Sequence, residues 1–195
     1  MRESLIVPFS NLLNDETCEK LITLFEKKAD TSTHHTLDNQ YNYCEINMYN
    51  DIDFNEHCKS IATLCMNAVD YYRKNACSFL LDTIPYFETI TTFETPVIRK
   101  YSKGEGFINW HFDSATFDSS RRFLAITIML NDVPCGGELE FKTPETAFNI
   151  HAKAGTLVIS PTSFEYLHRE NFANNDKYVI MTFALLPDTQ KYITD

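Results

Sequence analysis

The sequence predicts a mainly β fold that is preceded by helices. Apolar residues recur with helical spacing only in the first 78 residues, whereas short segments rich in β-branched and aromatic residues fill the second half. Several short strands separated by turn residues are typical of a sandwich or barrel. The 195 residues fit one domain, with helical support over about residues 1–78 and a β core over about residues 96–187.

The first half is expected to form two helices. Asn14 can cap a helix whose first turn carries Asp15 and Glu16, where carboxylates interact favourably with the helix dipole. A second helix is expected to begin at Asp53, with Glu56 completing a capping box. The apolar faces of the two helices consist of Cys18, Leu21, Ile22 and Phe25, and of Ile61, Leu64, Cys65, Ala68 and Tyr72.

The second half is expected to form the sheet. Its strands are predicted at residues 96–101, 107–112, 122–130, 138–141, 147–151, 155–160 and 178–186. Residues 38–50 could form a further strand and loop, and 78–95 could be either a loop or a strand. His34 and His35 are expected in a polar surface loop.

Composition excludes several classes of function. A formal net charge of −10 argues against nucleic acid as a partner, because phosphate binding needs clustered lysine and arginine. No apolar run reaches the length of a membrane span, and the N-terminus lacks the pattern of a signal peptide. The six cysteines contain no CxxC pair and are expected to be small buried hydrophobes in a reducing compartment. These features predict a soluble, cytoplasmic protein without a membrane partner and leave its oligomeric state open.

A candidate metal site lies in the β half. His111 and Asp113 stand two residues apart at the end of a predicted strand, so alternation places both on one face. An isolated HxD motif often arises by chance, and a tight site needs a third ligand. His168, between the last two predicted strands, is the candidate. Two histidines and one carboxylate form the facial triad of non-haem iron(II) oxygenases, which leaves coordination positions open.

Two further residues are candidates for binding an organic acid at this metal. Lys177 follows His168 by nine residues, and its ammonium could pair with the far carboxylate of a metal-chelated dicarboxylic acid. Tyr101 precedes His111 by ten residues, and its phenol could bond the same acid. The competing interpretations are a solvated strand end for Lys177 and a core aromatic for Tyr101.

These residues belong to a longer series of motifs that resembles the prolyl 4-hydroxylase branch of the iron(II)/2-oxoglutarate dioxygenases. The resemblance covers roughly residues 97–186, and the segment Pro8–Cys18 is also similar to the start of that domain. The motifs, in order, are Tyr101, His111-Phe-Asp113, Arg122, Leu130-Asn-Asp132, Gly136-Gly-Glu-Leu-Glu-Phe141, Gly155-Thr-Leu157, His168 and Lys177-Tyr178.

The resemblance implies a distorted double-stranded β-helix, or jelly roll, with helices supporting one sheet. It implies that His111, Asp113 and His168 bind Fe(II) and that Lys177 binds the far carboxylate of 2-oxoglutarate, with Tyr101 in the same pocket. O2 would be the second cosubstrate, and ascorbate would support the reaction.

The resemblance also implies residues on the substrate side. Arg122 matches a position near the peptide substrate of relatives, and Phe183 matches an aromatic position on that side. The chain departs from the family at Met129, where relatives often carry tyrosine, and at Met181, where threonine is common. Thr127, on the same strand face as Met129, could compensate by contacting 2-oxoglutarate.

The expected activity is hydroxylation of prolyl residues in a protein or peptide, with release of succinate and CO2. Tyr49, together with Tyr41 and Tyr43, could stack on a proline ring; ordinary packing is the alternative for these tyrosines. Two other functions remain open: oxidation of a free amino acid or small metabolite, and a non-catalytic binding module with the same fold.

Overall fold

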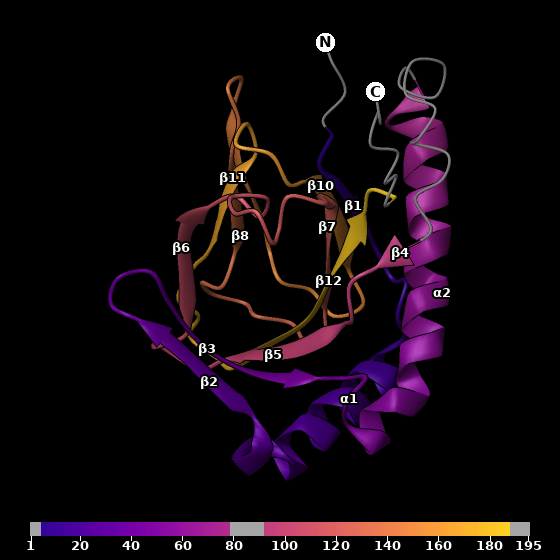
Figure 1. Ribbon diagram of the computed structural model, residues 1–195. Coiled ribbons are helices and arrows are strands. Elements are labelled where there is room, and N and C mark those ends of the chain that lie inside the picture. The colour runs from indigo at the N-terminus through magenta and orange to yellow at the C-terminus, as the bar shows by residue number, and fades with distance from the viewer. Residues whose placement is uncertain (1–4, 79–91, 188–195) are drawn as a thin grey trace.

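The computed structural model describes residues 5–78 and 92–187 and shows a rolled antiparallel sheet flanked by two helices (Figure 1). The helices are α1 (Asp15–Lys27) and α2 (Ile52–Asn75), and a 3-10 turn covers Ala29–Thr31. The strands are β1 (Val7–Phe9), β2 (Thr33–Leu37), β3 (Tyr41–Asn47), β4 (Thr92–Phe93), β5 (Val97–Tyr101), β6 (Phe107–His111), β7 (Arg122–Met129), β8 (Leu139–Lys142), β9 (Ala147–Ile150), β10 (Leu157–Pro161), β11 (Leu167–Glu170) and β12 (Lys177–Leu185).

The sheet rolls up because β3 joins its two walls. The strand order is β1-β10-β7-β12-β5-β3-β6-β11-β8-β9, with β2 added to β3 and β4 added to β12. One end of β3, from Cys44 to Asn47, pairs with β5, while Tyr41 and Asn42 pair with β6. The predicted jelly roll with supporting helices is therefore confirmed, and β5, β6, β11 and β12 surround one interior (Figure 1).

The helices cover the outer face of the wall that contains β5, β7, β10 and β12. Successive residues of a strand point to opposite faces, so Tyr178 and Ile180 of β12 join the core beneath the helices, whereas Val179 and Met181 face the interior of the roll. Leu21 and Phe25 of α1 are fully buried in the same outer core. Within the described residues, no helix is long and apolar enough to cross a bilayer.

The two helix starts differ in how well the sequence predicted them. Asn14 caps α1 as predicted, and its Oδ1 accepts a hydrogen bond from the Thr17 amide at 2.9 Å. The start predicted for α2 at Asp53 was wrong. Asp51 is the cap, because its Oδ1 accepts from the amides of Asp53 and Phe54 at 3.0 and 3.4 Å.

Each predicted strand is present with ends shifted by at most two residues, but several strands were missed. The first half contributes β1, β2 and β3 as well as helices, so its description as helical support was incomplete; β3 lies within residues 38–50, where a further strand was considered. His34 and His35 lie in β2 rather than in a loop, because every residue of this polar strand pairs with β3, from Tyr41 to Glu45. β11 was also missed, since four residues with three polar side chains form a strand only between β6 and β8. Most of the ambiguous segment 78–95 lies outside the described residues.

The capping of α2 generates a prediction. Asp51→Ala removes the acceptor for two amides and one partner of Lys28, whose ammonium lies 2.9 Å from Asp51 and 2.6 Å from Asp53. The loss of unfolding free energy is expected to be about 1 kcal/mol. Asp53→Ala is the matched control and should cost less, because it removes only the exposed ion pair. Urea denaturation measures both, and equal losses would contradict the assignment of Asp51 as the cap.

Candidate active site

The three predicted metal ligands meet at the junction of β6 and β11. His111 ends β6, and the register of the two strands places His168 of β11 directly opposite it. Their ring centroids are 4.3 Å apart. Asp113 follows two residues after His111, and its carboxylate oxygens lie 3.7 Å from the His111 Nε2 and 3.4 Å from the His168 Nε2. One ligand atom from each residue lies within 4.8 Å of the others, which is compatible with a single bound ion.

Backbone contacts fix which nitrogen of each ring faces the site. The Nδ1 of His111 lies 2.8 Å from the Asn109 carbonyl oxygen, and the Nδ1 of His168 lies 3.2 Å from that of Tyr166. A carbonyl oxygen only accepts, so each Nδ1 carries the proton and donates it. Each Nε2 therefore presents a lone pair, as metal-bound histidines do when a second group orients the ring.

The carboxylate of Asp113 has an unsatisfied oxygen. Its side chain is 6% exposed, and its Oδ2 has no hydrogen-bond partner. A buried charged oxygen without a donor is costly, and the nearest nitrogens are those with outward lone pairs. When both rings are neutral, three acceptor atoms converge here, an arrangement that suits a cation, so the residues present fit a divalent metal ion.

The pKa shifts of the triad reflect this crowding. Burial alone would raise the pKa of Asp113, but the charges of His168 and His111 outweigh burial and lower it. Burial lowers the pKa of His168 and favours its neutral form. Burial acts in the same direction on His111, but the hydrogen bond and charge of Asp113 outweigh it and raise the pKa of His111. In the metal-free site, His111 is thus the imidazole that most readily holds a second proton.

The residues expected to bind the organic acid lie deeper in the roll. Tyr101 ends β5, is 1% exposed and stands opposite Lys177 in the register of β5 and β12. Burial raises the pKa of Tyr101 far above its ordinary value, so the phenol stays protonated and can donate. Thr127 and Met181 are also opposite each other and line the same cavity, with the Thr127 Oγ1 2.8 Å from the Met181 sulfur.

Lys177 is buried, and its ammonium already has two partners within the chain. It is 1% exposed, its Nζ donates to the Gly137 carbonyl at 2.7 Å, and it forms a short ion pair with Glu170. The residues that line the cavity beside the triad include Glu170 but not Lys177.

Two charged lining residues, Arg99 and Glu170, were not singled out from the sequence. Arg99 donates from Nε to Glu45 at 2.7 Å, and its guanidinium lies 4.6 Å from the centroid of the Tyr43 ring. Strand alternation was the available signal. Arg99 precedes Tyr101 by two residues and Glu170 follows His168 by two, so each shares a strand face with a predicted site residue.

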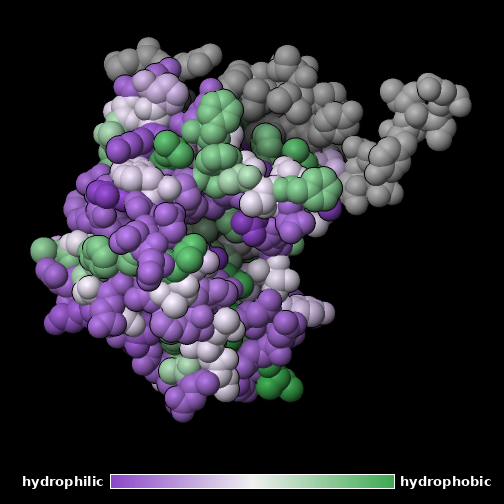
Figure 2. All heavy atoms as spheres, turned by 60° about the vertical axis from the view of Figure 1, so that its left-hand side comes forward, coloured by the Kyte–Doolittle hydropathy of each residue, from purple (hydrophilic) through white to green (hydrophobic). Residues whose placement is uncertain are grey.

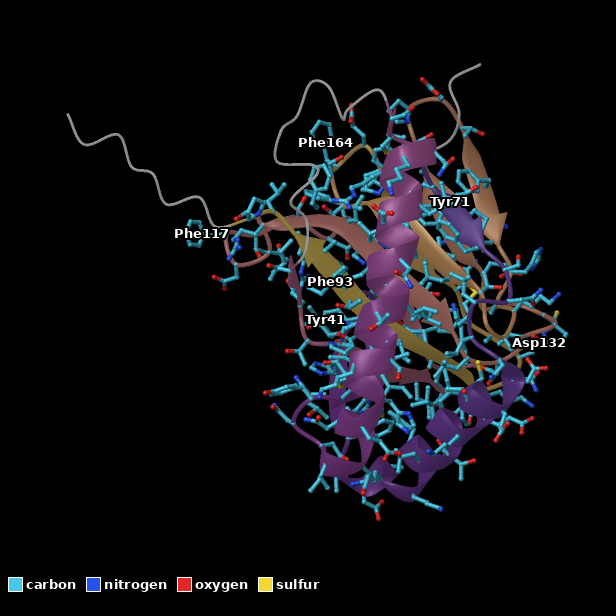
Figure 3. The ribbon with its side chains drawn as sticks, turned by 90° about the vertical axis from the view of Figure 1, so that its right-hand side faces the viewer. Tyr41, Tyr71, Phe93, Phe117, Asp132 and Phe164 are labelled. Carbon is cyan, nitrogen blue, oxygen red and sulfur yellow. The ribbon has the colours of Figure 1, made fainter. Side chains whose placement is uncertain are left out.

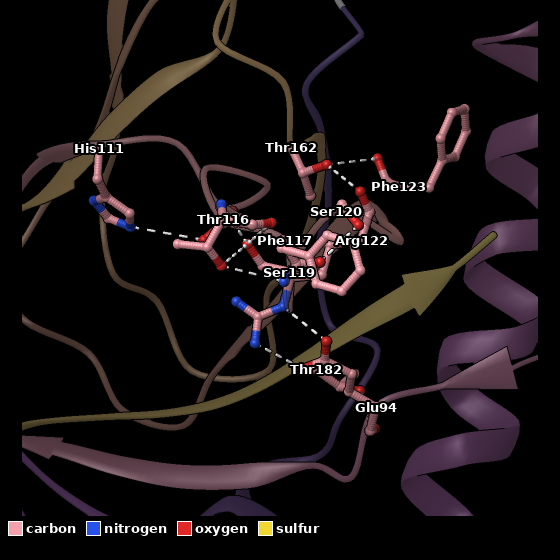
Figure 4. A network of polar contacts seen from close by, with 11 residues as sticks. Glu94, His111, Thr116, Phe117, Ser119, Ser120, Arg122, Phe123, Thr162 and Thr182 are labelled. Carbon is pink, nitrogen blue, oxygen red and sulfur yellow. Dashed lines mark hydrogen bonds and ion pairs between the residues drawn. The ribbon is translucent and has the colours of Figure 1, made fainter.

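Arg122 lies at the start of β7, on the side where a substrate was expected. Its guanidinium donates to both carboxylate oxygens of Glu94 at 2.7 and 2.8 Å (Figure 4). The same group lies 3.9 Å from the centroid of the Phe183 ring, which is 5% exposed. The two residues predicted on the substrate side therefore contact each other.

Tyr49 lies apart from this group. It is 63% exposed in the turn between β3 and α2. Its amide donates to the Asn47 side chain at 3.1 Å, and its carbonyl accepts from Asn55 at 2.8 Å. Tyr49 is not among the described residues that line the cavity. The Tyr43 ring, by contrast, contacts that of Tyr101 at a tilt of 48°, with ring centroids 5.9 Å apart.

The comparison with protein families agrees with this geometry. Residues 96–185 match the 2OG-Fe(II) oxygenase superfamily. This match covers the β core that carries the triad, and it confirms the resemblance seen in the sequence for this segment. No curated protein sequence matches the chain.

Solved structures share the whole architecture at low sequence identity. A Pseudomonas putida prolyl-4-hydroxylase aligns with a TM-score of 0.70 and 15% identity over 93% of this chain and 92% of its own. A prolyl hydroxylase from Trichoplax adhaerens, in complex with a hypoxia inducible factor peptide, aligns with a TM-score of 0.74 and 14% identity over 92% of this chain and 83% of its own. A viral collagen prolyl hydroxylase from Paramecium Bursaria Chlorella virus-1, in its 2OG complex, aligns with a TM-score of 0.59 and 17% identity over 95% of this chain and 97% of its own. At these identities the likeness establishes the fold.

The triad generates a metal-binding prediction. Asp113→Ala and His168→Ala each remove one of three ligand atoms and should weaken Fe(II) or Mn(II) binding at least about tenfold. His151→Ala is the control, because this histidine is 75% exposed and lies outside the triad. Calorimetric titration of the metal measures all three variants. Undiminished binding in Asp113→Ala would contradict the site.

The raised pKa of His111 generates a pH prediction. A metal must displace the proton that His111 holds. The apparent affinity for the metal is therefore highest above the raised pKa of His111 and declines as the pH falls through that pKa. The decline should begin at a higher pH than an ordinary histidine, with a pKa of about 6.5, would give. His168 should contribute little, because its pKa is lowered. Mn(II) titrations between about pH 8 and about pH 5.5 test this, and a flat affinity profile would contradict it.

Proposed function

We propose that this protein is an iron(II)- and 2-oxoglutarate-dependent dioxygenase that hydroxylates prolyl residues in a protein or peptide. The observation that carries the proposal is the convergence of His111, Asp113 and His168 around one point, where the buried Oδ2 of Asp113 has no hydrogen-bond partner. Their location in a β core of the 2OG-Fe(II) oxygenase superfamily supports iron as the ion. Bound iron would supply open coordination positions for a 2-oxo acid and O2.

The remaining side chains define the environment of the reaction. The backbone bonds to both Nδ1 atoms hold the imidazoles in place before a metal arrives. The protonated phenol of Tyr101 can donate to an acid at the inner end of the cavity. Five apolar side chains also line the cavity and would limit access of water: Ile108, Ala125, Leu139, Phe141 and Met181.

A substrate larger than a small metabolite is supported by the surface beside the triad. The loop that begins after Asp113 is joined to the loop before β11 by hydrogen bonds from Ser114 to the Thr162 carbonyl at 3.0 and 3.2 Å. These loops carry Phe117 and Phe164, which are 92% and 69% exposed and lie toward the end of the molecule opposite α1 (Figure 3).

Such exposed aromatic side chains suit contact with a peptide. Hydrophobic residues also gather in the upper part of the mainly hydrophilic face seen in Figure 2. The prolyl specificity itself is proposed from the solved prolyl hydroxylases with the same fold, one of which holds a peptide.

Turnover tests the proposal directly. The protein is incubated with Fe(II), 2-oxoglutarate, ascorbate and a panel of proline-containing peptides, while succinate and peptide mass are followed. A peptide that gains one oxygen with wild-type protein, and not with Asp113→Ala, would establish a prolyl hydroxylase. Succinate without peptide oxidation would overturn the prolyl substrate and favour a free amino acid or another metabolite. Neither product, with metal demonstrably bound, would favour a non-catalytic binding module.

A further inference from the structure

One of the charged groups that line the cavity beside the triad is the carboxylate of Glu170. Glu170 ends β11, follows His168 by two residues and therefore points to the same side of the strand. It is 5% exposed, lines the cavity and is ion-paired with the buried ammonium of Lys177. Since Lys177 also donates to the Gly137 carbonyl, two of its three donor positions are used within the chain.

The other cations around the cavity are matched in the same way. Arg99 pairs with Glu45 at 2.7 Å, and Arg122 pairs with Glu94. Each of these three cations thus has a carboxylate partner inside the chain. A second carboxylate brought to Lys177 would meet Glu170 at close range, and like charges in a buried site oppose each other strongly.

We propose that Glu170 occupies the position on Lys177 that the far carboxylate of 2-oxoglutarate would take, and so determines which 2-oxo acid the site accepts. The proposal rests on the proposed function, because it concerns an acid bound at the metal. Glu170 must leave Lys177 before a dicarboxylic 2-oxo acid can use it, and this lowers the affinity for 2-oxoglutarate. A 2-oxo acid without a far carboxylate does not compete with Glu170 and is not penalised.

The proposal is tested by binding rather than by turnover. Wild-type and Glu170→Gln proteins are loaded with Mn(II), and 2-oxoglutarate or pyruvate is titrated by calorimetry. The substitution keeps the size of the side chain and an acceptor for Lys177, but a neutral amide competes less well than a carboxylate. The variant should bind 2-oxoglutarate roughly tenfold more tightly or better, while pyruvate affinity changes less than about twofold. Unchanged or weaker 2-oxoglutarate binding, or an equal gain for pyruvate, would overturn the proposal.

Two further variants separate this competition from a general effect on the pocket. In Glu170→Gln/Lys177→Met the gain for 2-oxoglutarate should disappear, because it requires the released ammonium. In Glu170→Val the lysine is left without a charged partner, which destabilises the protein. Saturating 2-oxoglutarate should then raise its melting temperature more than that of the wild type. A gain that persists without Lys177, or an equal thermal shift, would count against the proposal.

Metal titration distinguishes this inference from the proposed function. If wild-type protein and Glu170→Gln both bind Mn(II) but the variant gains no affinity for 2-oxoglutarate, only the role of Glu170 fails. If neither protein binds a metal, the proposed function fails and the role of Glu170 fails with it.

Discussion

The cross-strand pair of His111 and His168 is the contact on which the rest of the site depends. The two residues face each other because β6 and β11 are antiparallel neighbours in one defined register. A slip of one residue would turn one imidazole to the opposite face of the sheet. The register shifts immediately after His168, which places Glu170 opposite Ile108 and ends regular pairing beside the site. Asp113 can then approach both rings from the loop that follows β6.

This pairing depends in turn on how the sheet closes. β3 pairs with β5 along one part of its length and with β6 along another, so the strand that carries His111 lies across the interior from β12 and β7. The two faces of the same strands therefore differ in role: the outer face packs in the core beneath the helices, and the inner face lines the cavity. The outer face of β12 packs under the helices through Tyr178 and Ile180, whereas its inner face contributes Met181 to the cavity.

The interior of the roll combines apolar side chains with several charged ones, and Lys177 and Arg99 each have a carboxylate partner. Buried ion pairs contribute little to stability once desolvation is counted, but they orient their members. Lys177 with Glu170 is a pair of this kind, and Arg99 with Glu45 is a partly buried one. Asp113 is the exception among the described residues at the site, because one of its oxygens lacks a donor. This contrast supports the two proposals that the triad binds an external cation and that Glu170 competes with an external anion at Lys177.

The sequence by itself determined the fold class, the main strands and the membership of the triad. Strand alternation puts His111 and Asp113 on one side over two residues, and the turn and apolar patterns around them are local properties of the chain. Only the tertiary structure decided the rest. β11 has little strand character of its own and forms because β6 and β8 flank it. The ion-pair partner of Lys177 could not be predicted from the spacing of residues in the sequence, because it depends on which side chains the rolled sheet brings together. For the same reason, Tyr49 remained at the surface while Arg99 and Glu170 entered the cavity.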